Sequence, residues 1–301
     1  MKRYKIKYRP EIDSLRAISV IAVIIYHAKI NLFGHQLFPG GYLGVDVFFV
    51  ISGYLITSII LKELHENKNF SFINFYFRRA RRILPALIFL LLCTLPIAWF
   101  VLLPSTFVDF SKSIYFSLGF SSNFFFYFTG LEYGGVDGLL KPLLHTWSLA
   151  VEEQYYILFP ILLVLSFLFF KKKINIVILL LLLLSLIFAE FFSSKNSNLN
   201  FYILPSRAWE LLVGAALVIL ESKRKFRSSD LMSNIFCLIG LGLIFLSFTY
   251  FYESVPSPGI KNTVPIIGTL LILIFINNKT LIARILNNNL FTSLGLISYS
   301  L

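Results

Sequence analysis

Residues 11–27 read Glu-Ile-Asp-Ser-Leu-Arg-Ala-Ile-Ser-Val-Ile-Ala-Val-Ile-Ile-Tyr-His, and this stretch predicts an apolar helix that carries a cation and an imidazole. Arg16 and His27 are eleven positions apart. That spacing is three turns plus roughly 20°, so both side chains leave one face, roughly 16 Å apart along the axis. A charge near the middle of a bilayer costs on the order of 3 kcal/mol and usually faces protein or a water-filled cavity. We therefore expect this face to line a polar channel.

The composition is that of a chain surrounded by lipid. Hydrophobic residues make up 57% and charged residues 14% of the 301 residues, against roughly 45–50% and 25% in an average soluble domain. The formal net charge of +12 would suit nucleic acid, but the basic residues lie in short loops between apolar runs, so we expect no nucleic-acid partner. Cys93 and Cys237 lie inside apolar runs and predict neither disulfides nor a metal site.

Nine apolar runs predict an all-α fold, a polytopic bundle of about nine transmembrane helices. The basic tail 1–10 precedes the first run without a cleavage site, as in a signal anchor. Most runs approach the roughly 20 residues that cross a bilayer, and they lie at about 11–30, 42–61, 83–101, 149–170, 174–192, 205–221, 232–252, 263–278 and from 290 onward. We expect a single domain over 1–301 that is incomplete at its C-terminus.

The distribution of basic residues predicts the orientation of the bundle. Alternate loops, beginning with the N-terminal tail, hold 20 of the 27 lysines and arginines. Because cytoplasmic loops carry this excess, we expect a cytoplasmic N-terminus. The apolar stretch 107–128 would reverse every later loop if it crossed the membrane, so we interpret 105–144 as an interfacial or re-entrant segment on the outer side.

Charged residues recur where the second and sixth runs begin. Asp46 is an acid inside an apolar run and requires a partner, whereas Ser52 and Gly53 fit close helix packing. Arg207 precedes Glu210 by three positions. We favour an ion pair of Arg207 with Glu210 or with an acid from another helix, and we keep substrate binding as its alternative role.

The densest basic cluster is Arg-Arg-Ala-Arg-Arg-Ile-Leu-Pro at residues 78–85. A plain topological anchor is one interpretation. The planar guanidinium group also suits phosphates, and the spacing of 78, 79 and 82 places two such groups on one helix face. The cluster therefore predicts a cytosolic docking site for a phosphate-rich ligand.

Residues 145–156 read His-Thr-Trp-Ser-Leu-Ala-Val-Glu-Glu-Gln-Tyr-Tyr and place His145, Ser148 and Glu152 on one helix face. One acid here is explained by helix capping or by an interhelical hydrogen bond, but the adjacent Glu152 and Glu153 together indicate function. No Gly-x-Ser-x-Gly elbow surrounds Ser148, so we do not expect it to be a hydrolase nucleophile.

Together these stretches resemble the acyltransferase-3 family of bacterial membrane O-acyltransferases, which acetylate O-antigen, peptidoglycan and other surface glycans. The resemblance covers nearly the whole chain and rests on four stretches in order: residues 8–16 with His27, 44–57, 78–85 and 145–154. Family members continue beyond this length, some into an SGNH hydrolase-like domain, which is why we expect the C-terminus to be incomplete.

The resemblance implies transfer of an acyl group, usually acetyl from cytosolic acetyl-CoA, to a hydroxyl of a surface glycan such as lipopolysaccharide O-antigen or peptidoglycan. It implies a multi-pass protein of the bacterial cytoplasmic membrane, with lipid, acyl-CoA and glycan as partners and no metal. His27 would act as a base or carry the acyl group. The expected sets are His27, Arg16, Asp46, Glu152 and Glu153 for catalysis, Arg78, Arg79, Arg81 and Arg82 for the donor, and Ser52, His145, Trp147, Ser148 and Arg207 for the acceptor.

Two other classes of protein fit part of the sequence. In a secondary transporter or glycan exporter, Arg16, His27, Asp46 and Glu152 would form a proton relay. Inverted repeats favour that class, and we find none. A structural membrane scaffold accounts for the apolar runs but leaves the buried charges unexplained.

Overall fold

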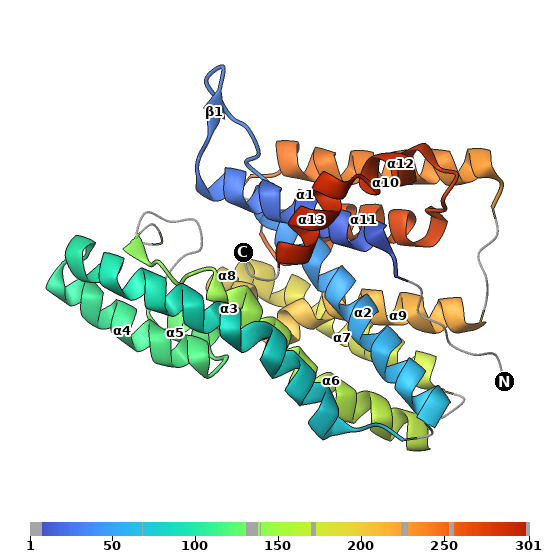
Figure 1. The fold of residues 1–301 in the computed structure, drawn as a ribbon, viewed down its shortest axis with the longest axis horizontal. Helices are drawn as coiled ribbons and strands as arrows, with labels where there is room; N and C mark the ends of the chain where they lie inside the picture. The colour runs from blue at the N-terminus through green and yellow to red at the C-terminus, as the bar shows by residue number, and fades with distance from the viewer. Residues whose placement is uncertain are drawn as a thin grey trace.

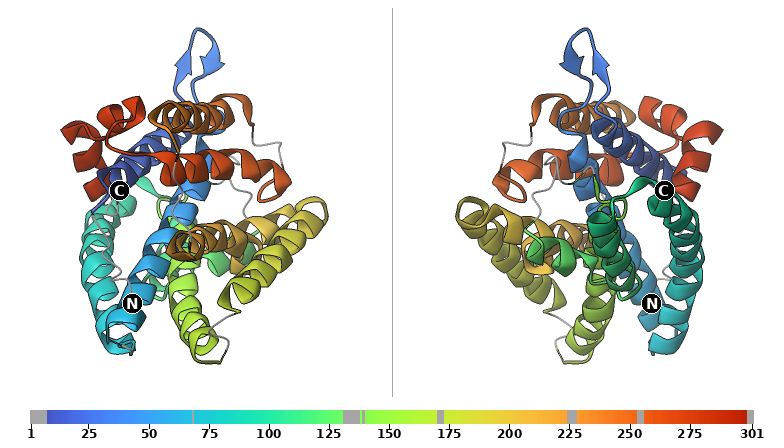
Figure 2. Two further views of the ribbon diagram at one scale, coloured as in Figure 1. Left: turned by 90° about the vertical axis from the view of Figure 1, so that its right-hand side faces the viewer. Right: turned by 90° about the vertical axis from the view of Figure 1, so that its left-hand side faces the viewer.

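The computed structural model describes residues 8–67, 69–130, 138, 140–169, 173–223, 228–252 and 256–298, and these residues are mostly helical (Figures 1 and 2). Its helices are α1 Pro10–His27, α2 Gly44–Asn67, α3 Phe72–Val101, α4 Pro104–Leu118, α5 Ser122–Phe128, α6 Thr146–Phe169, α7 Ile174–Lys195, α8 Ser197–Tyr202, α9 Leu204–Lys223, α10 Asp230–Tyr250, α11 Thr263–Phe275, α12 Leu281–Leu286 and α13 Asn289–Ile297, with short 3-10 helices η1 Gly41–Leu43 and η3 Ile260–Asn262. A two-stranded hairpin, β1 Asn31–Leu32 and β2 His35–Gln36, projects from the helices (Figure 1).

The helical bundle expected from the apolar runs is confirmed. Five helices among the described residues are long and apolar enough to cross a membrane: α2, α3, α6, α7 and α10. Helices α1, α9, α11 and α13 correspond to the other four predicted runs, but α1 carries three charged residues within its 18 positions, and α11 and α13 have only 13 and nine residues. The count of nine spans therefore stays a prediction.

The predicted orientation also stays a prediction. Residues 1–7, 171–172 and 224–227, which carry much of the basic charge that it uses, lie outside the described residues. Residues 131–137 and 139 of the expected interfacial segment lie outside them as well, as do residues 299–301.

Helix α2 joins two groups of helices, α1 with α10–α13 and the group α3–α9 (Figure 1). Its closest neighbour is α9, and the two backbones meet at glycines. A Cβ atom on Gly53 would lie 1.8 Å from the carbonyl oxygen of Leu211, and one on Gly214 would lie 2.0 Å from that of Val50. The small residue expected at position 53 thus permits contact between two backbones, as in other membrane helix pairs.

Helix α3 stands at the edge of the bundle and packs on α4. Its 30 residues extend roughly 45 Å, which exceeds the roughly 30 Å hydrocarbon thickness of a bilayer. Apolar residues of α3 and α4 form a second core with Leu143, comprising Leu87, Leu91, Ala98 and Phe110. The segment expected to be interfacial or re-entrant thus contains two helices, α4 and α5, and α4 lies alongside α3 (Figure 1).

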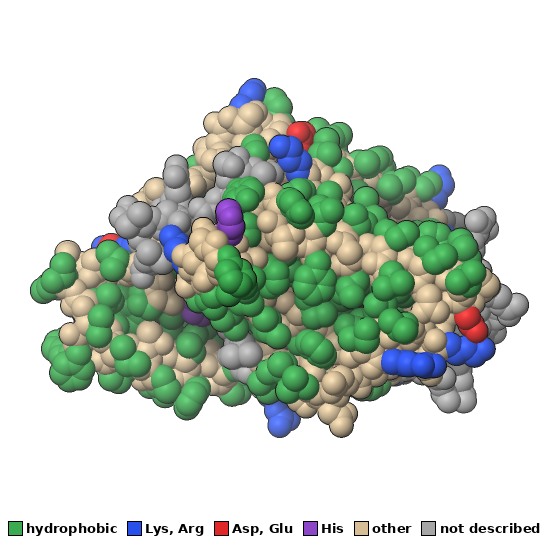
Figure 3. All heavy atoms as spheres, turned by 90° about the horizontal axis from the view of Figure 1, so that it is seen from above, with side chains coloured by type: hydrophobic (Ala, Val, Ile, Leu, Met, Phe, Trp, Pro, Cys, Tyr) green, Lys and Arg blue, Asp and Glu red, His purple; other side chains and the backbone are tan. Residues whose placement is uncertain are grey.

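The outer surface of the bundle is rich in apolar side chains, in keeping with a lipid environment. Figure 3 shows hydrophobic side chains across one face, with few lysine, arginine or acidic side chains. On α3, Phe89 and Phe100 are 70% and 86% exposed. Such exposure is expensive in water and favourable in hydrocarbon.

Candidate functional site

A pocket of about 190 Å³ lies between α1, α2, α3 and α6. From α1 it is lined by Arg16, Val20 and Val23, whose steps of four and three residues place them on one helix face. From α2 come Val45, Phe48 and Phe49, and α3 supplies an apolar wall from Ile83 to Leu90. A cavity of this size has room for a small group such as an acyl group.

Arg16 supplies the pocket with a buried cation. The residue is 4% exposed, and its guanidinium lies 4.0 Å from an Asp13 carboxylate oxygen and 5.8 Å from the centroid of the Phe48 ring. Arg16 thus pairs with Asp13, one turn earlier on α1, and it also lines the pocket. A positive charge at this place can stabilise negative charge that develops on a bound group.

His27 ends α1, three turns beyond Arg16 on the same helix face. Its side chain is exposed and packs edge-on against Tyr26, with ring centroids 4.9 Å apart. His145 lines the pocket rim and keeps solvent exposure, although many protein atoms surround its ring. This desolvation lowers the pKa of His145, and the nearby charge of His27 lowers it further, against a hydrogen bond with the Pro142 backbone that raises it. Two imidazoles thus lie within electrostatic reach of each other. His27 itself is not among the residues that line the pocket, so the lining follows the predicted face of α1 from Arg16 to Val23 and does not include His27.

Glu152 brings a carboxylate from α6 to the pocket wall. Its Oε1 atom accepts hydrogen bonds from the Ser52 hydroxyl on α2 and from the Tyr156 hydroxyl on α6. The structure therefore joins two residues expected in the site, Ser52 and Glu152. Tyr156 was not expected from the sequence, although its place one turn after Glu152 was a usable signal.

Ser148 and Trp147 occupy different places despite being neighbours in the chain. Ser148 lines the pocket and donates to the backbone carbonyl of His145 at 3.1 Å. Trp147 is 1% exposed and packs edge-on against Phe49, with ring centroids 6.5 Å apart. Trp147 thus lies behind a residue that lines the pocket, and we do not find it among the lining residues themselves.

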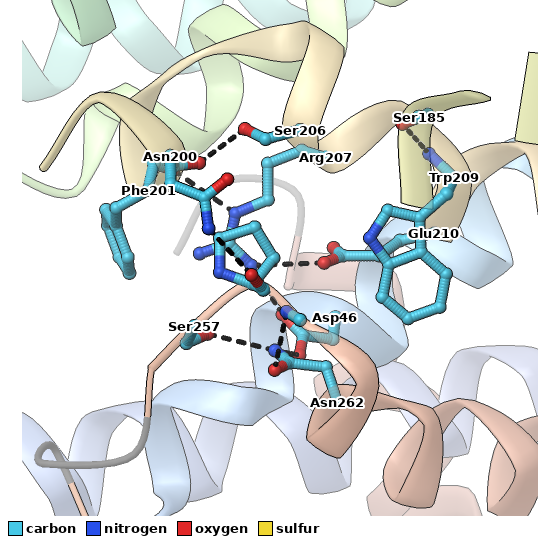
Figure 4. Close-up of polar contacts among 12 residues, drawn as sticks. Asp46, Ser185, Asn200, Phe201, Ser206, Arg207, Trp209, Glu210, Ser257 and Asn262 are labelled. Atoms are coloured by element: carbon cyan, nitrogen blue, oxygen red, sulfur yellow. Dashed lines mark hydrogen bonds and ion pairs between the residues drawn. The ribbon is translucent and has the colours of Figure 1, made fainter. Parts of the chain in front are cut away.

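Asp46 and Arg207 lie in a second, fully buried polar cluster (Figure 4). Arg207 Nη1 lies 2.9 Å from Asp46 Oδ1 and 3.2 Å from Glu210 Oε1, so both ion pairs considered from the sequence are present. Asn262 donates to the other Asp46 oxygen at 2.5 Å, and nothing in the sequence pattern pointed to this partner. Neither Asp46 nor Arg207 lines the pocket.

The guanidinium of Arg207 also lies against two aromatic rings, 4.6 Å from the centroid of Phe201 and 5.3 Å from that of Trp147. The cluster thereby connects α2 and α9 to the N-terminal turn of α6 and to α8. Through Trp147 and Phe49 it supports the pocket from behind. Its position indicates a structural role for the ion pair.

The four arginines of residues 78–82 do not share one face of α3. Arg78, Arg81 and Arg82 are exposed, and Arg78 pairs with Glu63 at 3.4 Å. Arg79 is 8% exposed and points into the bundle. The spacing of 78 and 82 does place two guanidinium groups on one accessible face, as expected.

Glu153 is 7% exposed, and its Oε1 atom has no hydrogen-bond partner among the described residues. It lies within electrostatic reach of Glu152 and Arg79. The described part of the chain contains no group of three or more His, Cys, Asp or Glu residues arranged to hold a metal.

A third polar cluster, which the sequence did not indicate, ties the start of α1 to three other helices. Arg9 donates to Tyr54 Oη at 2.8 Å and to the backbone carbonyl of Leu273 at 2.7 Å. Tyr54 in turn donates to Glu221 at 2.9 Å. These contacts join the first residues of the described chain to α2, α9 and α11 and fix the position of α1, which carries Arg16 and His27.

Sequence comparisons with known proteins match this chain to acyltransferases. A family model for acyltransferase-3, described as an acyltransferase domain, matches residues 9–301. The chain is 37% identical over 162 residues to O-acetyltransferase OatA of Staphylococcus aureus strain NCTC 8325, covering 54% of this chain and 26% of that protein.

Two further relatives cover more of the chain. It is 33% identical over 234 residues to the putative peptidoglycan O-acetyltransferase YrhL of Bacillus subtilis strain 168, covering 76% of this chain and 36% of that protein. It is 33% identical over 311 residues to the putative O-acetyltransferase SAS0844 of Staphylococcus aureus strain MSSA476. This match covers 100% of this chain and 50% of that protein. The chain thus spans between a quarter and a half of these relatives. No solved structure matches.

Proposed function

The chain belongs to the acyltransferase-3 family, and on that premise we propose that it transfers an acetyl group from cytosolic acetyl-CoA to a hydroxyl of a cell-surface glycan. Peptidoglycan is the favoured acceptor, because a relative that aligns with 76% of the chain is named as a putative peptidoglycan O-acetyltransferase. The protein would act as a multi-pass protein of the bacterial cytoplasmic membrane, with its N-terminus in the cytosol.

The observation that carries the proposal is the pocket between α1, α2, α3 and α6. It brings the Arg16 cation, the His145 imidazole and the Glu152 carboxylate to one small cavity in an otherwise apolar bundle. Charged groups in such surroundings are costly, so their presence together favours a function. Arg16 would supply a charge stabiliser and Glu152 an orienting acceptor, while His145 lies within electrostatic reach of His27, which would be the proton-transfer group.

We expect the acetyl end and the nucleotide end of acetyl-CoA to bind at different places. The pocket of about 190 Å³ would hold the acetyl group and its sulfur atom, and the nucleotide of acetyl-CoA would lie toward the exposed arginines of α3. The exposed Arg78 and Arg82 lie on α3 immediately before Ile83, which lines the pocket. Their guanidinium groups suit the phosphates of the donor.

His27 would provide the base. In one route it removes the proton of the acceptor hydroxyl as the oxygen attacks the thioester carbonyl, and coenzyme A leaves as its thiol. In the other route His27 first takes the acetyl group and then passes it to the hydroxyl. Either way, Arg16 would stabilise negative charge at the inner part of the pocket.

The proposal is tested with membranes that contain the full-length protein, isotope-labelled acetyl-CoA and peptidoglycan. We expect label to appear on the glycan as alkali-labile O-acetyl groups. Movement of glycan across the membrane without labelling would instead support the transporter class. A short-lived acetyl group on His27, trapped by rapid denaturation near neutral pH, would select the route in which His27 carries the acetyl group.

A further inference from the structure

Arg79 differs from the arginines around it in the direction of its side chain. It is 8% exposed, whereas Arg78, Arg81 and Arg82 are exposed. Arg79 also precedes Ile83 and Leu87 by one and two turns, and both of these residues line the pocket. Arg79 therefore lies on the same face of α3 as these two lining residues, one turn before the apolar wall begins.

The Arg79 guanidinium lies near two aromatic rings. It lies 4.5 Å from the centroid of Tyr156 and 5.8 Å from that of Phe75, both nearly inaccessible to solvent. Cation–π contacts of this kind strengthen as water is removed. The ring of Tyr156 thus contacts a cation, and its hydroxyl donates to Glu152, one turn earlier on α6.

The hydroxyl of Tyr156 donates to Glu152 Oε1, which also accepts from Ser52 and lies in the pocket wall. Glu153, the next residue, is buried and lies within reach of the Arg79 charge. A continuous set of contacts therefore runs from Arg79 through Tyr156 to the Glu152 carboxylate. The same cation partly offsets the charge of Glu153.

We propose that Arg79 is a positioning residue, which orients Tyr156 and thereby Glu152 in the pocket, and that it does not bind the phosphates of the donor. The inference rests on the proposed function and divides the arginine cluster into two roles. Arg78 and Arg82 face outward and bind the anionic donor. Arg79 faces inward and holds the carboxylate that orients the reacting groups.

The test compares Arg79→Met with Arg78→Met, two neighbouring arginines changed to the same uncharged residue. Acetyl transfer by the full-length protein is measured at varied acetyl-CoA concentration. Loss of one charge-assisted contact corresponds to about tenfold. We expect Arg78→Met to raise the KM for acetyl-CoA about tenfold with kcat retained, and Arg79→Met to lower kcat about tenfold or more with that KM retained.

Two conservative variants keep the test decisive if Arg79→Met folds poorly. Tyr156→Phe retains the ring under Arg79 but loses the hydroxyl, so kcat should fall while KM for acetyl-CoA stays constant. Arg79→Lys retains the charge and should recover part of kcat. Size-exclusion chromatography in detergent confirms the folded fraction of each variant.

The inference is overturned if Arg79→Met raises the donor KM as Arg78→Met does and leaves kcat intact, since Arg79 would then be a donor ligand. It is also overturned if Tyr156→Phe retains full kcat. Absence of transfer by the unaltered protein would instead refute the proposed function, so the two failures are distinguishable.

Discussion

Arg207 Nη1 on α9 lies 2.9 Å from Asp46 Oδ1 on α2, and this ion pair joins the two helices inside the apolar core. The same nitrogen lies 3.2 Å from Glu210 Oε1. One cation therefore serves two buried carboxylates, while Asn262 donates to Asp46 from η3. Because the partners are almost fully inaccessible to solvent, removal of the cation leaves more uncompensated charge than removal of either acid.

This asymmetry predicts unequal losses of stability. Arg207→Met should lower the free energy of unfolding by about 3–5 kcal/mol, the usual cost of breaking a buried pair. Asp46→Asn keeps the pair of Arg207 with Glu210 and should cost less. Thermal unfolding in detergent measures both, and equal losses would contradict a cluster organised by Arg207.

Because the backbones of α2 and α9 are in contact, a single methyl group added at that contact should lower the stability of the protein strongly. A Cβ on Gly53 would lie 1.8 Å from the Leu211 carbonyl oxygen, whereas one on Gly242 of α10 meets nothing within 4 Å. Gly53→Ala should therefore destabilise the bundle by about 1–3 kcal/mol or more. Gly242→Ala is the matched control and should be neutral or stabilise the helix by up to about 1 kcal/mol. Similar unfolding temperatures for the two variants would argue against the close contact.

If His27 is the base, its replacement should cause a large loss of acetyl transfer. His27→Ala should reduce labelling of the glycan by about 100-fold or more, since proton transfer by a positioned group contributes about 10²–10⁴-fold. His35→Ala, at an exposed position of strand β2, should retain activity. Labelling by His27→Ala at the level of the unaltered protein would remove His27 from the mechanism.

Two serines of α2 predict opposite outcomes for activity. Ser52 and Ser58 are each 6% exposed, but Ser52 donates to Glu152, whereas Ser58 donates to the Tyr54 carbonyl of its own helix. Ser52→Ala should lower kcat about tenfold, the equivalent of one hydrogen bond to a charged group. Ser58→Ala should keep kcat, because its hydroxyl has a local backbone partner. Equal kcat values in the two variants would contradict a role for the Ser52 contact.

The lowered pKa of His145 predicts a pH dependence of stability. Because the unfolded chain binds the proton more readily, stability is fully present above the ordinary histidine pKa of about 6.5. It is lost as the pH falls from that value through the lower pKa of the folded protein. His145→Gln should weaken this loss in unfolding temperatures measured between about pH 7 and 5, and an unchanged slope would contradict the shift.

The sequence alone predicted a helical bundle and the polar residues that its apolar runs carry. Apolar runs of helical length predicted the bundle, and the spacing of Arg16 with the pocket-lining Val20 and Val23 explains why that face of α1 lines a cavity. The three-residue interval between Arg207 and Glu210 likewise predicted their contact. These features follow from local geometry, since a helix fixes which of its own residues share a face.

Only the tertiary structure decided what lies opposite each face. It placed Asp46 with Arg207, 161 positions away, and turned Arg79 inward while its neighbours stayed exposed. It also put Trp147 behind the pocket while His145 and Ser148 line it. The partner of a buried polar side chain depends on how distant helices pack, and helical periodicity contains no information about that packing.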